Sequence, residues 1–134
     1  TDRTSAPESI LGGSIYLKRV MAKIPERIPE PDRTWLAVAS YNVGFGHVED
    51  ARIITESQRA NPDSWDDVRE RLPLLSDPGW YEHLARGYAK GSEPVAYVNN
   101  VRRYFELLKW MTAEKKLVQD HPFDSKQTDE INPG

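Results

Sequence analysis

The apolar residues near the start of the chain recur at helical spacing. They lie seven, four and three positions apart on one helical face, at Ile10, Leu17, Met21 and Ile24. Ser5 is suited to the N-cap of this helix, and Pro25 cannot continue it. Gly12 and Gly13 each cost about 1 kcal/mol relative to alanine inside a helix. Their presence favours a close helix crossing.

Two further helices are predicted in the middle of the chain. The prolines within 25–31 form a stiff connector, after which a new element begins near Asp32. Residues 35–39 are apolar on nearly every side, which is typical of a short buried helix, and this helix stops at 41–44. The next helix runs to about Arg59 and has its apolar face at Val48, Ala51 and Ile54.

Shorter elements are expected between residues 61 and 89. A turn at 61–63 and a cap at Ser64 precede a short helix with an apolar stripe at Trp65, Val68 and Leu72. Pro73 is expected to end this helix, and a loop then reaches Gly79. One more helical segment is expected within 80–89.

The last predicted helix is the clearest. Ser92 serves as N-cap, Pro94 stands in the first turn, and the apolar positions of a long core helix follow at Val98, Val101, Phe105, Leu108 and Met111. We expect one all-α domain over 1–118, followed by a polar C-terminal tail over 119–134, because no alternating run indicates a strand.

Composition narrows the possible functions. Hydrophobic residues make up 38% and charged residues 29%, as in ordinary globular domains. The net charge of −3 argues against nucleic-acid binding, and no apolar run is long enough to cross a membrane. Cysteine is absent, and no glycine-rich phosphate loop occurs. The three histidines, His47, His83 and His121, lack metal-ligand spacing. Neither a metal nor an organic cofactor is therefore expected.

Two segments carry candidate chemistry. Tyr41 and Asn42 can hydrogen-bond a polar ligand, and Gly44 lets a ligand approach the backbone. The same residues also fit an ordinary helix C-terminus in left-handed geometry with a packed tyrosine. Glu93 and Tyr97 share one face of a first helical turn, where an acidic residue is also favoured by the helix dipole.

Aromatic residues precede the second segment. Trp80-Tyr81 and Gly87-Tyr88 suit stacking against sugar rings, and they equally suit a core.

Together these segments resemble two motifs of the family 1 lytic transglycosylases, which have a goose-type lysozyme fold. The first motif is 39–44 with its preceding apolar helix, and the second is Glu93 to Val101. Residues 61–65 and 71–75 also resemble an insertion that a membrane-bound subfamily carries between the two motifs. The resemblance extends from Thr1 to about Lys115.

The resemblance implies cleavage of the β-1,4 bond between N-acetylmuramic acid and N-acetylglucosamine, with formation of 1,6-anhydromuramic ends. It implies supporting catalytic roles for Tyr41 and Glu93, and substrate binding by Asn42, Gly44, Tyr88 and Tyr97. The family's catalytic glutamate lies upstream of this chain, and no glutamate here matches it in position, including Glu8, Glu49 and Glu56.

The implied partners are peptidoglycan glycan strands and an upstream segment of the same protein. The implied location is the periplasm, at the outer membrane through parts outside this chain. The alternatives are a helical module that binds peptidoglycan or a partner protein without cleaving, and a purely structural helical module.

Overall fold

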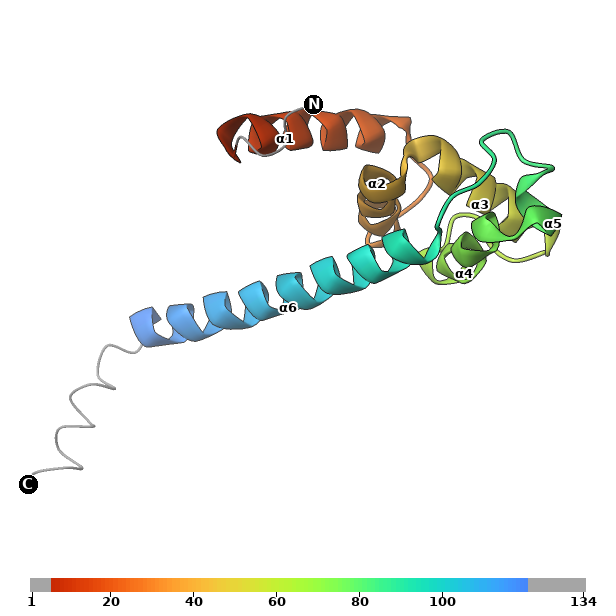
Figure 1. The fold of residues 1–134 in the computed structure, drawn as a ribbon. Helices are drawn as coiled ribbons and strands as arrows, with labels where there is room; N and C mark the ends of the chain where they lie inside the picture. Colours follow the sequence, from red (N-terminus) through yellow and green to blue (C-terminus); the bar gives the residue numbers. More distant parts are fainter. Residues whose placement is uncertain (1–5, 121–134) are drawn as a thin grey trace, which may run out of the picture. The chain divides into compact units, whose positions relative to one another are not determined.

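The structure, a computed structural model, describes residues 6–120 (Figure 1). Over these residues every regular element is helical, which confirms the all-α prediction. In order the elements are α1 (Ala6–Lys23), α2 (Asp32–Val43), α3 (Phe45–Ser57), α4 (Trp65–Arg71), the 3₁₀ helix η1 (Leu72–Ser76), α5 (Pro78–Tyr81) and α6 (Ser92–Asp120). The chain divides into two compact units, with the boundary after Asn99.

The core of the first unit is built from the predicted apolar faces. Leu36 of α2, Ile54 of α3 and Trp65 of α4 are each about 1% exposed, and burial of such side chains is worth roughly 1.5–3 kcal/mol each. The predicted stripes are confirmed in full at Val48, Ala51, Ile54, Trp65, Val68 and Leu72. The predicted cap Ser64 accepts a hydrogen bond from the backbone N–H of Asp67 at 3.4 Å.

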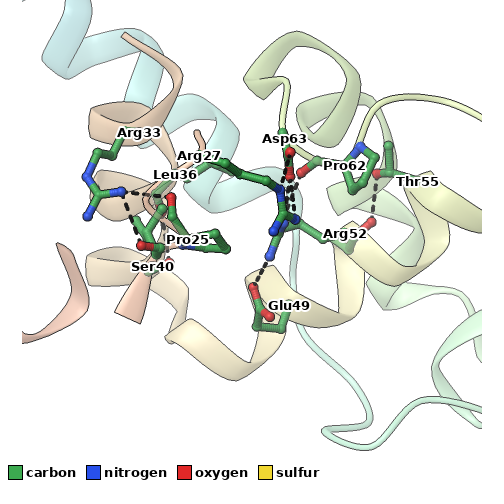
Figure 2. Close-up of polar contacts among 12 residues, drawn as sticks. Pro25, Arg27, Arg33, Leu36, Ser40, Glu49, Arg52, Thr55, Pro62 and Asp63 are labelled. Carbon is green, nitrogen blue, oxygen red and sulfur yellow. Dashed lines mark hydrogen bonds and ion pairs between the residues drawn. The ribbon is translucent and has the colours of Figure 1, made fainter. Parts of the chain in front are cut away.

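The end of α1 and the proline connector are fixed by Arg33. Its guanidinium donates to the backbone oxygens of Met21 at 2.7 Å, Ile24 at 3.1 Å and Pro25 at 2.9 Å (Figure 2). Carbonyls at the end of a helix lack the partners that a further turn would supply. Here the Met21 and Pro25 carbonyls also accept hydrogen bonds from the backbone N–H groups of Ile24 at 3.3 Å and Ile28 at 3.1 Å. One side chain of α2 therefore ends α1 and anchors the connector. The predicted cap Ser5 lies outside the described residues.

Gly44 is the single residue between α2 and α3. The left-handed helix C-terminus, one of the two interpretations of this segment, is not found here, because Gly44 has φ 107° and ψ 140°. That extended, positive-φ region is populated almost solely by glycine. The sharp turn that starts α3 directly after α2 therefore requires glycine at this position.

The expectations for residues 72–91 were partly wrong. Pro73 does not open a loop but stands in the first turn of η1, where the missing N–H costs nothing. Within 80–89 the helix α5 ends at Tyr81, and Gly87 has φ 72°, which a continuing helix does not allow. Leu84 and Tyr88 lie four residues apart, as on one face of a helix, so the end of the helix at Tyr81 does not follow from the apolar spacing.

The structure confirms the last predicted helix, but the prediction that its apolar face lies in the core is wrong after Val98. Pro94 and Val98 are buried in the first unit. The residues expected to continue the core in the second unit are about half exposed, with values of 48%, 47% and 52% for Phe105, Leu108 and Met111. Periodicity shows that a helix has an apolar face, but it does not show what covers that face.

The helix α6 continues to Asp120, across the boundary expected at residue 118. The remainder of the expected polar tail, 121–134, lies outside the described residues. Among residues 6–120, no helix is long and apolar enough to cross a membrane.

Candidate functional site

Three tyrosines from three helices form a cluster in the first unit. The ring of Tyr41, in the last turn of α2, lies 5.7 Å from the ring of Tyr16 on α1, at an interplanar angle of 59°. The Tyr41 ring also lies 6.4 Å from the ring of Tyr97, centroid to centroid, at an interplanar angle of 12°, which is a stacked arrangement. The two sequence segments singled out for their chemistry therefore meet at the Tyr41–Tyr97 pair.

The cluster depends on a close approach at Gly13 of α1. A Cβ atom at this position would lie 2.7 Å from the Tyr41 hydroxyl oxygen and 3.5 Å from two atoms of its ring. Only glycine leaves room for the hydroxyl where it stands. The predicted close helix crossing is confirmed at Gly13, and it explains why a residue that weakens the helix stands there.

An apolar groove runs between α1 and α2. It has a volume of about 460 Å³ and is lined by Leu17, Lys18, Met21, Thr34 and Val38. Thr34, Val38 and Tyr41 follow one another at helical spacings of four and three on α2, so they share one face. A largely apolar wall with a few polar groups is suited to a ligand that has both apolar faces and hydroxyl groups.

The other predicted site residues lie apart from this pair or have other partners. Asn42 is exposed, and the Glu93 side chain is 60% exposed, with Lys90 Nζ 3.8 Å from its Oε1. Tyr88 is 57% exposed and meets Tyr81 edge-on at 5.7 Å. Glu93 and Tyr97 do start from the same first turns of α6, but Tyr97 contacts Tyr41 whereas the carboxylate faces solvent.

Sequence reasoning missed Tyr16. It stands three residues after Gly13, one helical turn away, and is 37% exposed. Its sequence context, a single tyrosine three residues after a glycine, did not mark it as part of a site.

Sequence reasoning also missed a charged network around Asp63 (Figure 2). Arg52 of α3, whose side chain is 11% exposed, donates to Glu49 Oε1 at 2.7 Å, to Asp63 Oδ1 at 2.8 Å and to the Pro62 carbonyl at 2.8 Å. Arg27 reaches the same Asp63 from the proline connector, with 2.8 Å between its Nε and Oδ2. The network joins the connector to the turn before α4.

The Asp63 carboxylate carries a pH-dependent part of the stability. The hydrogen bond from Arg27 lowers the pKa of Asp63, burial opposes the shift, and Arg52 lowers the pKa further. A carboxylate with a depressed folded-state pKa stabilises the fold above its unfolded pKa, and this stabilisation is lost as the pH falls through the folded pKa.

We therefore expect Asp63→Asn to lower the free energy of unfolding by about 1–3 kcal/mol at pH 7, since the bonds that it weakens involve charged groups. The difference from the wild type should shrink below about pH 4. Urea unfolding at several pH values measures it. The matched control is Asp66→Asn, because the Asp66 side chain is 74% exposed and should matter little. A difference that is constant with pH would contradict the assignment.

Within residues 6–120, no group of three or more His, Asp or Glu side chains is placed to hold a metal ion. His121 lies outside the described residues.

The chain is similar to a known domain family and to proteins that share one name. Residues 1–63 match the family described as "Transglycosylase SLT domain". Proteins named "Membrane-bound lytic murein transglycosylase F" are similar over most of this chain. The protein from Idiomarina loihiensis is 54% identical over 115 residues, which is 86% of this chain and 25% of the relative. The one from Marinobacter nauticus is 58% identical over 107 residues, or 80% and 21%.

A relative from Salmonella arizonae is 48% identical over 135 residues, which is 95% of this chain and 26% of that protein. The chain thus spans about a quarter of the length of the curated relatives that it matches.

Proposed function

We propose that this chain, which is similar over most of its length to the membrane-bound lytic murein transglycosylases F, forms part of an enzyme that cleaves peptidoglycan glycan strands. The bond would be the β-1,4 linkage between N-acetylmuramic acid and N-acetylglucosamine, and the product would carry a 1,6-anhydromuramic end. The observation that carries the proposal is the Tyr41–Tyr97 stack, since it unites the two family motifs in one place.

The reaction needs one carboxyl group in two protonation states. As an acid it gives its proton to the oxygen that leaves when the C1–O bond breaks, and as a base it takes the proton of the muramoyl C6 hydroxyl, whose oxygen bonds to C1. No water is consumed. The acid must be protonated near neutral pH, which requires a poorly solvated site.

The glutamates that the structure describes near the cluster do not meet that requirement. The side chains of Glu93 and Glu49 are 60% and 39% exposed, so neither lies in a poorly solvated site. As the resemblance to the family implies, we assign the catalytic acid to a segment outside this chain. Tyr41 would hydrogen-bond the acid or the reacting sugar, and Tyr97 would fix the Tyr41 ring in place.

The remaining family positions would bind the substrate. Asn42 and Gly44 would shape the floor of the cleft, and the exposed Tyr88 ring would stack on a more distant sugar. Glu93 would orient the substrate through hydrogen bonds to its hydroxyl or amide groups. As the relatives' name implies, the enzyme would act in the cell envelope, and we propose the periplasm, with attachment to the outer membrane through other parts of the protein.

The proposal is tested by incubating the full-length protein with purified sacculi and measuring soluble fragments by chromatography. We expect release by the wild type and a loss of about 10²-fold with Tyr41→Ala, because misplacing one positioning group can cost that much. Absence of fragments from well-folded wild-type protein would overturn the proposal.

A second candidate is a module that binds peptidoglycan without cleaving it, since the groove and the tyrosine cluster both lie within this chain. Co-sedimentation of the chain with sacculi, without fragment release by the full-length protein, would support this candidate. If Tyr41→Phe and Glu93→Gln leave co-sedimentation unchanged, neither the Tyr41 hydroxyl nor the Glu93 carboxylate contributes to binding.

A further inference from the structure

The segment from Glu82 to Gly91, which links α5 to the first turn of α6, has no regular secondary structure (Figure 1). The direction in which α6 starts depends on how this segment is fixed, and the start of α6 sets where Tyr97 stands. Backbone groups in such a segment have no helical partners, so they need other hydrogen bonds.

Asp50 of α3 provides one of these bonds. Its side chain is 2% exposed, although aspartate is rarely buried to this degree, and it plays no part in the proposed reaction. Its Oδ2 accepts a hydrogen bond from the backbone N–H of Arg86 at 3.0 Å, across 36 positions of sequence. A bond from a backbone N–H to a buried carboxylate is charge-assisted and stronger than a neutral one.

The side chain of Arg86 is held on the same helix. A Cβ atom at Gly46, one turn before Asp50, would lie 2.4 Å from Arg86 Nε and 2.9 Å from its Cδ. The arginine side chain therefore lies directly across Gly46. The carboxylate of Asp50 thus binds the backbone of Arg86, and Gly46, one turn earlier on α3, leaves room for the Arg86 side chain.

The other end of the segment is fixed on η1. The Ala89 N–H donates to the Leu75 carbonyl at 3.1 Å, and Gly91 packs against the Leu72 carbonyl so closely that a Cβ there would lie 1.7 Å from the oxygen. Between the two anchors the chain turns through Gly87 with φ 72°. Tyr97 then lies one and a half helical turns into α6.

We infer that Asp50 is a positioning residue: by holding Arg86 on α3 it sets the start of α6, and so keeps the Tyr97 ring stacked on Tyr41. The structural part of this inference is independent of the reaction, whereas its catalytic consequence rests on the proposed function. It predicts that loss of the carboxylate disturbs the ring pair, although Asp50 touches neither ring.

The test compares Asp50→Ala and Asp50→Asn with the wild-type chain by NMR. With alanine we expect loss of the nuclear Overhauser contacts between the Tyr41 and Tyr97 rings, and exchange of the Arg86 amide proton that is faster by about tenfold or more. Asparagine keeps an acceptor of the same size, so the ring contacts should return while the amide still exchanges faster than in the wild type.

Asp32→Ala is the matched control. Asp32 Oδ1 accepts a hydrogen bond from the Trp65 backbone N–H, also at 3.0 Å, and thereby joins α2 to α4 instead of anchoring 82–91. We expect Asp32→Ala to lower stability and to keep the ring contacts. Ring contacts that persist in Asp50→Ala, or that vanish equally in Asp32→Ala, would overturn the inference.

If Asp50→Ala does not fold, Asp50→Asn decides the matter. Unchanged exchange of its Arg86 amide would overturn the inference, and selective acceleration there, with the amide of Val68 unaffected, would support it. In the full-length protein we expect Asp50→Ala to lower kcat for sacculus cleavage about tenfold, with rescue by Asp50→Asn. Inactive wild-type protein with the expected NMR result would reject the proposed function and leave the positioning role standing.

Discussion

Replacing Gly91 by alanine is expected to destabilise the protein by about 3 kcal/mol or more, because the added Cβ would overlap backbone rather than a movable side chain. That atom would stand 1.7 Å from the Leu72 carbonyl oxygen and 2.3 Å from its carbon. Relief requires η1 and the start of α6 to move apart, which would also open the buried contacts of Leu72 and Val98. Thermal and urea unfolding measure the loss.

Gly79→Ala provides the control for Gly91. A Cβ at Gly79 would meet its nearest neighbour, Asp77 Oδ1, at 3.4 Å, which is ordinary contact. Because Gly79 lies in α5, alanine there should be neutral or slightly stabilising. A Gly91→Ala protein within about 1 kcal/mol of the wild type would contradict the close approach of Gly91 to the Leu72 carbonyl.

Gly13→Ala is expected to lower the activity without lowering the stability of the fold. Alanine favours the helix by about 1 kcal/mol, and the atom it meets, the Tyr41 hydroxyl at 2.7 Å, is the far end of a side chain that can tilt. The fold should therefore be as stable as the wild type. The tilt displaces Tyr41 from the site, so cleavage of sacculi by the full-length protein should fall by about tenfold to 10²-fold.

A double-mutant cycle gives the control for Gly13. In a Tyr41→Phe background the clashing oxygen is gone, and the nearest ring atoms lie 3.5 Å from the added Cβ. Adding Gly13→Ala to Tyr41→Phe should then cost little further activity, so the two effects are not additive. Full additivity, or a Gly13→Ala enzyme as active as the wild type, would contradict the role given to this contact.

The helices could be predicted from the sequence where apolar residues at helical spacing are bounded by a capping residue or by a residue that ends a helix. The faces of Val48, Ala51 and Ile54 and of Trp65, Val68 and Leu72 follow directly from spacing. The segment after Pro73 could not be predicted, because its course depends on bonds from Asp50 and Leu75, which are distant in sequence. The prediction that the apolar face of α6 is buried was wrong for a related reason, since the spacing of apolar residues does not show which element covers them.

The candidate site was predictable only in part. Tyr41 and Tyr97 stand out through family motifs. Their ring centroids lie 6.4 Å apart although the residues are 56 positions apart, and no pattern in the sequence indicates this contact. Tyr16 was missed because a single tyrosine on a helix has no distinguishing pattern. The same holds for the network of Arg27, Arg52 and Asp63, whose members come from three separate segments.

The central claim is that this chain belongs to an enzyme that cleaves glycan by internal attack of the muramoyl C6 hydroxyl. The most direct test is mass spectrometry of the fragments that the full-length protein releases from sacculi in ¹⁸O-labelled water. The account predicts 1,6-anhydromuramic ends that are one water lighter than hydrolysis products and carry no label from the solvent. Reducing ends that contain ¹⁸O would show hydrolysis and contradict it.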